Sequence, residues 1–331
     1  MSFVREKKTI CGENYIEMDL FEMANMHLKG KPDKRKNAST MKQIAQNNKN
    51  ARRYFTQLVN TNFGENDFCI HATYARACMP STVEEAEKNV TNYMRRIKAR
   101  RKKEGLPSPR YIIVTEYRTK EDGRPTRIHH HIIMDGMLDR DIVADLWRAP
   151  RKKGEHKGRK LGMVNVDKLQ PDEYGLEALA RYLTKGLTGK KKWHPSKNLK
   201  KPVVRKNDYR YSRKKLISLT SQTDCPDVWQ KLYPGYLLTE ASAIFTTDAG
   251  WHITVKMRRD ITYAKNHNSG HPEFIRPILH QSSPPVRKLQ TEKPGQSLSD
   301  DIQKNLKILY HTITCCSWPS VPNSAITLPL F

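Results

Sequence analysis

Two segments with strong β propensity, joined by a tight-turn signal, constrain the fold of this chain more than any other feature. Residues 110–117 and 127–134 are rich in β-branched and aromatic side chains, which favour strands. Between them, Asp122 and Gly123 form the dipeptide preferred in two-residue type I′ turns. The sequence therefore predicts an antiparallel hairpin over residues 110–134.

Further strands and helices are predicted around this hairpin, between about residues 64 and 190. Residues 68–74 alternate apolar and polar side chains, as expected of a strand, and residues 160–168 favour another strand. Helices are predicted after the capping-box pattern at residues 81–84, over residues 138–147 with Asp139 as the cap, and from Pro171 onward. This order predicts an α+β domain with a central antiparallel sheet and helices packed on it.

The flanking regions differ in composition, which gives four expected parts. We expect a basic N-terminal arm over residues 1–55 (an arm or a surface helix), the α+β domain over 56–190, and a basic extension with a small folded subdomain over 191–262. That subdomain includes a strand predicted at residues 250–257. Residues 263–331 are rich in Ser, Pro and Asn without periodicity, so we expect a largely disordered tail.

The charge of the chain indicates a polyanionic partner. There are 60 Lys and Arg against 34 Asp and Glu, which gives a formal net charge of +26. Nucleic acid is favoured as the partner, because Lys and Arg neutralise phosphates and release counterions. A basic soluble protein and a membrane-surface protein are the alternatives. No apolar stretch is long enough to span a membrane, no secretory signal is recognisable, and the scattered cysteines favour a reducing cytoplasm.

One basic stretch, residues 185–215, is the strongest candidate for DNA contacts. It carries thirteen Lys or Arg and one acid, with aromatic residues among them. Such a stretch can follow a phosphate backbone while its aromatic rings stack on bases. A solvated linker is the alternative. The candidate DNA-binding residues are Lys190, Lys191, Lys192, Trp193, Arg205, Arg210, Arg213 and Lys214.

Three consecutive histidines lie in the second strand of the hairpin. Because alternate residues of a strand share a face, His129 and His131 should point one way and His130 the other. A turn at Asp122 and Gly123 places Glu116 opposite His129, unless a bulge at Pro125 shifts the pairing by one. Two imidazoles and one carboxylate would then form a divalent metal site. An incidental cluster of surface histidines is the alternative.

A candidate nucleophile lies in the helix expected after Pro171. Its apolar stripe leaves Tyr182 and Lys185 on a flank that is free to face a cleft. The stripe consists of Leu176, Leu179, Ala180 and Leu183. The same Tyr-x-x-Lys spacing occurs at Tyr117 and at Tyr211, but only Tyr182 lies in a well-formed amphipathic helix. An ordinary tyrosine on a helix surface is the alternative.

These three motifs, taken in order over about residues 64–190, resemble those of the HUH endonucleases, which include rolling-circle replication initiators of phages and plasmids. The resemblance implies that His129, His131 and Glu116 bind a metal, Mg²⁺ or Mn²⁺. It also implies that Tyr182 is the nucleophile and Lys185 its helical neighbour. Some members use a second tyrosine four residues upstream; Ala178 stands there, so a single-tyrosine enzyme is expected.

The resemblance implies a nickase for single-stranded DNA or an extruded origin hairpin. The expected products are a 5′-phosphotyrosine link and a free 3′-OH, in the cytoplasm of a bacterial host cell. The chain has no complete P-loop motif, so a host helicase and polymerase are expected partners, and the oligomeric state stays open. Three alternatives remain: a transposase or mobilisation relaxase of the same superfamily, a metal-dependent nuclease using activated water, and a non-enzymatic basic DNA-binding protein.

Overall fold

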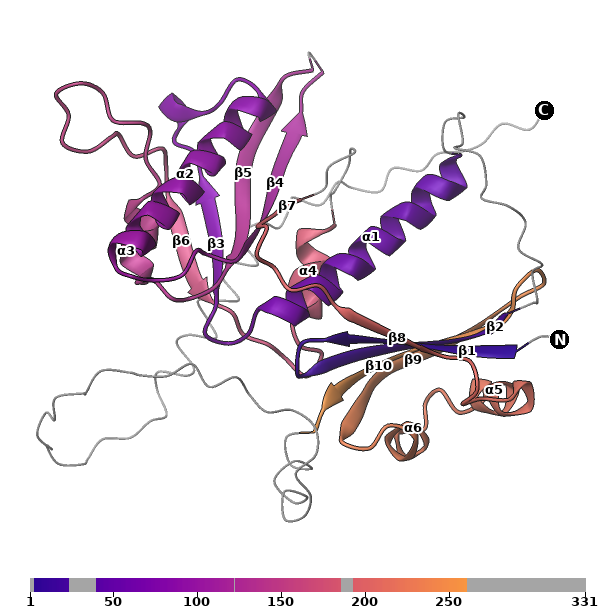
Figure 1. Ribbon diagram of the computed structural model, residues 1–331. Helices are drawn as coiled ribbons and strands as arrows, with labels where there is room; N and C mark the ends of the chain where they lie inside the picture. The colour runs from indigo at the N-terminus through magenta and orange to yellow at the C-terminus, as the bar shows by residue number, and fades with distance from the viewer. Residues whose placement is uncertain (1–2, 24–39, 122, 186–192, 261–331) are drawn as a thin grey trace, which may run out of the picture. The chain divides into compact units, whose positions relative to one another are not determined.

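The structure is a computed structural model that describes residues 3–23, 40–121, 123–185 and 193–260 (Figure 1). The chain divides into two compact units, residues 1–271 and 272–331, and every described residue lies in the first. The expected tail over residues 263–331 and the candidates Lys190, Lys191 and Lys192 are outside the described residues. Within the described part, no helix is long and apolar enough to cross a membrane.

The first sheet contains the predicted hairpin and has the strand order β6-β3-β5-β4-β7, antiparallel throughout (Figure 1). Its strands are β3 (Phe68–Thr73), β4 (Tyr111–Thr119), β5 (Pro125–Met134), β6 (Val164–Lys168) and β7 (His194–Pro195). Its helices are α1 (Met41–Asn62), η1 (Arg76–Cys78), α2 (Val83–Lys103), α3 (Arg140–Asp145) and α4 (Glu177–Leu183). The predicted α+β class is confirmed.

Helices cover both faces of this sheet, because side chains of successive strand residues alternate between the faces. On one face, Ile70 and Ile132 join a core with α2 and α3. On the other face, Val114 and Ile133 join a core with α1 and α4. Any polar residue that shares the second face is therefore held between the sheet and the α1 and α4 side.

The helix ends agree with the sequence in part. Asp139 caps α3 as predicted, and Gly105, with φ of 72°, follows the end of α2 as predicted. The cap of α2 is Thr82, one residue later than the predicted Ser81. The predicted start of α4 at Pro171 is wrong, because residues 171–176 contain a turn closed by Asp172 and Gly175 and the helix begins only at Glu177.

A second antiparallel sheet, with the order β8-β1-β2-β10-β9, was not predicted as a unit. It consists of β1 (Phe3–Cys11), β2 (Tyr15–Met23), β8 (Val203–Asn207), β9 (Tyr236–Thr246) and β10 (Gly250–Arg259). The helices α5 (Arg213–Thr220) and α6 (Pro226–Leu232) share its core, and the predicted strand at residues 250–257 is confirmed within β10. The prediction of an arm is wrong for residues 3–23, since both strands pair and bury apolar side chains in that core.

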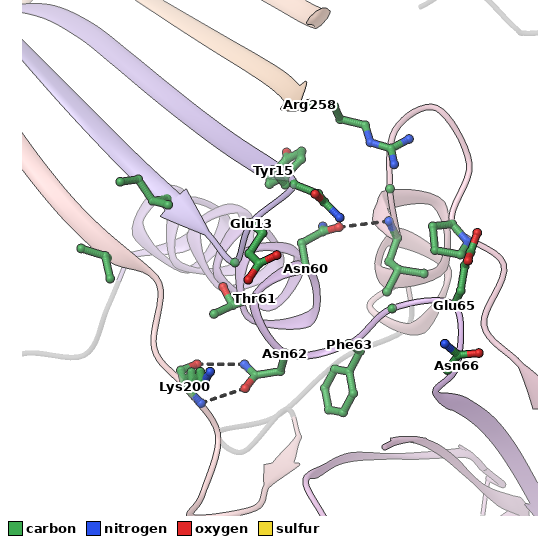
Figure 2. A pocket seen from close by; sticks show the side chains of 18 of the residues that line it. Glu13, Tyr15, Asn60, Thr61, Asn62, Phe63, Glu65, Asn66, Lys200 and Arg258 are labelled. Carbon is green, nitrogen blue, oxygen red and sulfur yellow. Dashed lines mark hydrogen bonds between the residues drawn. The ribbon is translucent and has the colours of Figure 1, made fainter. Parts of the chain in front are cut away.

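The C-terminal end of α1 is fixed to two other segments by asparagine side chains at a cavity of about 670 Å³ (Figure 2). The Asn60 Oδ1 atom accepts a hydrogen bond from the backbone N–H of Leu176, at 3.1 Å. Asn62 donates to the carbonyl of Lys200 and accepts from its N–H, at 2.8 Å each. The first of these contacts fixes the residue at the N-terminal cap of α4.

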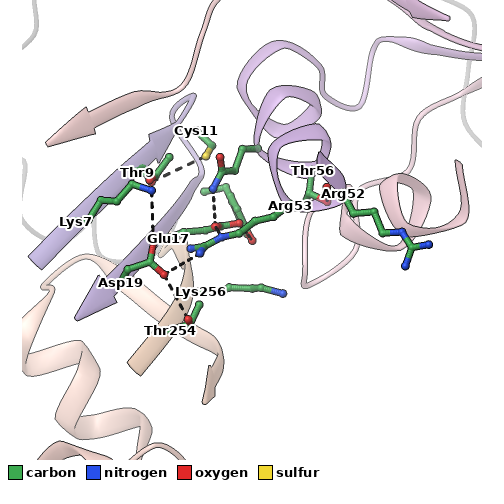
Figure 3. A network of polar contacts seen from close by, with 12 residues as sticks. Lys7, Thr9, Cys11, Glu17, Asp19, Arg52, Arg53, Thr56, Thr254 and Lys256 are labelled. Carbon is green, nitrogen blue, oxygen red and sulfur yellow. Dashed lines mark hydrogen bonds and ion pairs between the residues drawn. The ribbon is translucent and has the colours of Figure 1, made fainter. Parts of the chain in front are cut away.

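A polar network links α1 and α4 to the second sheet (Figure 3). Arg53 of α1 forms ion pairs with the buried carboxylates of Glu17, at 2.5 Å, and Asp19, at 2.8 Å. Lys256 of β10 pairs with Glu177 of α4 at 2.6 Å. Burial alone would raise the pKa of Asp19, but hydrogen bonds from His252 and Arg53 outweigh it and lower that pKa to about 2.

Candidate metal and tyrosine site

The hairpin pairs in the register that the sequence predicts at the histidines. Glu116 lies opposite His129, and Val114 lies opposite His131. The bulge expected near Pro125 is present, but the register shifts only between Glu116 and Arg118, on the turn side of the histidines. The pairing that forms the site is therefore unaffected. Asp122 itself is outside the described residues.

This register brings the predicted ligands together. The Glu116 Oε2 atom is 3.4 Å from the Nε2 atom of His129 and 3.5 Å from the Nε2 atom of His131. The two imidazole rings lie 5.0 Å apart between centroids. One carboxylate and two imidazoles thus converge on one patch of the sheet.

A third histidine, His71 of β3, joins this cluster and was missed at the sequence level. It pairs with His131 across the sheet, and the two rings stack at 4.8 Å. One nitrogen from each of His71, His129 and His131 lies within 4.8 Å of the others. The alternation of residues 68–74 indicates which face His71 occupies within its own strand. Only the adjacency of β3 and β5, which local patterns do not encode, places it beside the other two.

The protonation and hydrogen bonding of the cluster suit a divalent cation. The buried Nε2 atom of His131 has no hydrogen-bonding partner, although unpaired buried polar atoms are costly. Burial, followed by the neighbouring His131 and His129, lowers the pKa of His71 to about 4, so its imidazole is neutral at pH 7. Interaction with His131 is the largest contribution that lowers the pKa of Glu116 to about 2. Neutral imidazoles and an ionised carboxylate are the forms that bind metals.

The bulge orients one of these histidines. Arg127 has φ of 51°, in the left-handed region, and its carbonyl oxygen is 2.8 Å from the Nδ1 atom of His129. A hydrogen bond in which Nδ1–H donates to this carbonyl leaves the lone pair on Nε2, the nitrogen that faces Glu116. The bulge therefore selects the tautomer of His129 that can bind a metal through Nε2.

His130 lies on the opposite face of the sheet, as the alternation predicts. It is fully buried, with Nε2 at 2.9 Å from the hydroxyl of Tyr74 and Nδ1 at 3.0 Å from the hydroxyl of Thr115. Burial lowers its pKa to about 3. His130 is therefore a satisfied core residue and no part of the cluster.

Tyr182 of α4 stands at the cluster. Its ring is edge-on to that of His131, with centroids 5.7 Å apart, and the residue is 62% exposed. Ala180 and Leu183, from the predicted apolar stripe, are buried against the sheet and α1. Lys185 follows in the turn after the helix, where its N–H donates to the carbonyl of Tyr182. The helix thus buries its apolar side and leaves the phenol at the histidines.

The other tyrosines with the same spacing have different surroundings. Tyr211 is 6% exposed, belongs to the core of the second sheet, and its hydroxyl is 3.0 Å from that of Tyr233. Burial raises its pKa. Tyr117 lies on β4 at the bulge, between the pairs Glu116–His129 and Arg118–Thr126. Among the three, Tyr182 is the one whose ring contacts the cluster.

The candidate DNA-binding residues that the structure describes fall into two groups. Arg205 and Lys214 are exposed, on β8 and α5, and Arg213 of α5 pairs with Glu22 while remaining largely exposed. Trp193 packs edge-on against Phe55, and Arg210 is bound to other groups of the protein. These last two have structural contacts that account for their presence.

The contacts of Arg210 illustrate that second group. Its guanidinium pairs with Glu6 at 3.0 Å, donates to the carbonyl of Leu232, and lies 4.6 Å from the ring centroid of Tyr233. A side chain with these partners stabilises the second sheet and its helices. Basic composition alone does not separate such a residue from one that meets phosphate.

Comparison with known proteins gives one match. Residues 68–187 match a family model for replication-associated proteins of the ORF2 type. No curated protein and no solved structure matches the chain. The matched segment is about a third of the chain and contains all of Glu116, His71, His129, His131 and Tyr182. Over these residues the chain is similar to replication-associated proteins, and the match supports a role in the initiation of replication.

Proposed function

We propose that this protein is an endonuclease that nicks single-stranded DNA to start rolling-circle replication, with Tyr182 as the nucleophile. One observation carries the proposal: the exposed phenol lies against His131 in a cluster of three imidazoles and one carboxylate. A nucleophile beside a cation site is the arrangement that phosphoryl transfer to a side chain needs. The match to replication-associated proteins supports the biological setting.

His129, His131 and Glu116 would hold the cation, with His71 as a further ligand. The unpartnered, buried Nε2 atom of His131 and the neutral state of His71 support this assignment. We propose Mg²⁺ or Mn²⁺, which would polarise the scissile phosphate and offset the charge that develops in the transition state. Three imidazoles favour Mn²⁺ over Mg²⁺, since Mg²⁺ prefers oxygen ligands and Mn²⁺ lies above it in affinity for nitrogen.

The proposed reaction is a transesterification. The phenol oxygen of Tyr182 attacks phosphorus, the bond from phosphorus to the 3′ oxygen breaks, and the phenol proton is balanced by the proton gained at the new 3′-OH. The 5′ phosphate stays linked to the tyrosine, so the strand can be rejoined without ATP. Lys185, three residues beyond the nucleophile, would orient the phosphate or favour the phenolate of Tyr182.

The cellular setting follows from the same proposal. The substrate would be single-stranded origin DNA or an extruded hairpin, because a packed duplex shields its backbone from a site on a sheet. A host helicase and polymerase would unwind and copy the template in the cytoplasm of a bacterial host. With Ala178 in place of a second tyrosine, closing the product circle would require another nucleophile, such as Tyr182 of a second subunit.

A covalent adduct tests the proposal against its alternatives. The purified protein is incubated with Mn²⁺ and a labelled single-stranded origin oligonucleotide, then boiled in detergent. We expect an adduct with the wild type and none with Tyr182→Phe, while Tyr211→Phe keeps the adduct if that variant is folded. DNA cleavage without an adduct would indicate a nuclease using activated water. Salt-dependent binding without cleavage would indicate a non-enzymatic DNA-binding protein.

A transposase or relaxase of the same superfamily would share the active residues and the adduct. The DNA sequence required for cleavage separates these alternatives. We expect efficient cleavage of an origin-like hairpin located near the gene and none of sequences from the ends of a mobile element.

A further inference from the structure

A second concentration of positive charge lies apart from the candidate site. Seven of the nine residues 95–103 in α2 are Lys or Arg. Seven of the thirteen residues 148–160, which connect α3 to β6, are also Lys or Arg, with Glu155 as the one acid. We name these two segments together the outer basic surface.

Some of these cations build the structure. Arg101 is fully buried and pairs with Asp135, to whose carbonyl it also donates at 2.7 Å. Arg96 donates to the carbonyls of Leu146, at 3.0 Å, and Arg148. Arg96 thus fastens the start of the 148–160 segment to α2, which makes the two basic segments neighbours.

Most of the remaining cations face solvent. Three exposed lysines of α2 and three exposed cations of the 148–160 segment form no ion pair with an acid among the described residues. They are Lys98, Lys102, Lys103, Arg151, Lys152 and Lys153. Six cations without a carboxylate partner in the described part of the chain are available to an external anion.

The 148–160 segment has a fixed base. The N–H of Ala149 donates to the carbonyl of Arg159 at 2.8 Å, and the N–H of Leu161 donates to the carbonyl of Trp147 at 3.1 Å. A side chain at Gly158 would lie 2.0 Å from the carbonyl oxygen of Ala149, so only glycine fits there. The segment is therefore a ribbon with paired arms that presents Arg151, Lys152 and Lys153 near its end.

The outer basic surface belongs to the face of the first sheet that is opposite the histidine cluster. The buried side of α2 packs with Ile70 and Ile132, and the neighbouring His71 and His131 point to the other face. A ligand on α2 and a strand at Tyr182 therefore occupy different sides of the sheet and do not compete.

The composition of this surface selects the class of ligand. None of residues 95–103 or 148–160 is Phe, Tyr or Trp, whereas single-stranded nucleic acid is typically held by stacking on such rings. Cations without aromatic rings recognise phosphates without reading bases, as in sequence-independent duplex binding. We propose that the outer basic surface binds the phosphate backbone of double-stranded DNA. In a nicking enzyme, this would hold the duplex that flanks the exposed single strand.

Duplex binding gives its own readout, independent of nicking. The slope of log affinity against log salt for a mixed-sequence duplex reports the number of phosphate contacts, at about 0.9 per contact. Two triple variants, K98A/K102A/K103A and R151A/K152A/K153A, each remove three exposed cations from the surface. We expect each to lower duplex affinity at least tenfold and to reduce the slope by about 2 to 3. A charge-matched control, K197A/K215A/K231A, should change both much less.

The outcomes separate this proposal from the proposed function. Short single-stranded oligonucleotides should form the covalent adduct equally well with both triple variants, because neither touches the histidines or Tyr182. Thermal unfolding identifies any variant that fails to fold, and the other triple then serves. If both folded triples bind duplex as the wild type does, or lose no more affinity than the control, the duplex proposal is wrong. A wild type that binds duplex but never forms an adduct would overturn the nicking mechanism alone.

Discussion

The ring of Tyr182 stands edge-on to the imidazole of His131, with centroids 5.7 Å apart, although 51 positions separate the two residues in sequence. The relationship depends on two independent supports. The hairpin register puts His131 on the face shared with α4, and Asn60 fixes the residue that caps α4. Each support can be perturbed without changing either residue of the pair.

His71 is expected to contribute to cation affinity. Replacing it with alanine should weaken Mn²⁺ binding at least tenfold, because one of three converging imidazoles is lost. Isothermal titration calorimetry with the metal alone measures this without DNA. His156→Ala, at an exposed position in the 148–160 segment, is the matched control and should bind Mn²⁺ as the wild type does. Equal affinity in the two variants would remove His71 from the ligand set.

The backbone conformation of Arg127 is expected to matter more than its side chain. Arg127→Gly should keep Mn²⁺ affinity, because glycine adopts the left-handed conformation without strain and leaves the carbonyl beside His129. Arg127→Val should lose affinity, since a β-branched residue disfavours this conformation, by about 1–2 kcal/mol or more. Calorimetric titration of both variants with Mn²⁺ checks the pair. Loss of affinity in the glycine variant would mean that the guanidinium, and not the bulge, supports the site.

Stability toward acid is expected to depend on Asp19. Its pKa is about 2 in the folded protein, below the unfolded value of 3.8, so its contribution is present above about pH 4 and is lost as the pH falls toward 2. The contribution is on the order of 2 kcal/mol. Denaturant unfolding of the wild type and Asp19→Asn from pH 2 to 7 measures it. The difference between the two should shrink toward pH 2; a difference that stays constant with pH would assign the effect to packing.

The sequence predicts the part of the site that local chemistry determines. The turn near Gly123 and two β-prone segments specify which residues of β4 and β5 face each other, so Glu116, His129 and His131 could be placed together. The apolar stripe of α4 likewise indicates that Tyr182 lies on the flank away from the core.

What the sequence does not predict depends on contacts between distant segments. His71 joins the cluster because β3 pairs with β5, and β1 becomes a central strand because it pairs with β8, about 200 residues away. No local pattern specifies such partners. In the same way, basic composition favours DNA contacts for Arg210, whereas tertiary packing gives it Glu6 and Tyr233 as partners.

The most direct measurement of the central claim is to identify the residue that becomes linked to DNA. The Mn²⁺-dependent adduct is digested with protease and nuclease, and the peptide carrying the residual nucleotide is sequenced by mass spectrometry. Attachment through a phosphodiester to the phenol oxygen of Tyr182 is the predicted result. Attachment to Tyr117, Tyr211 or any other residue would contradict the account.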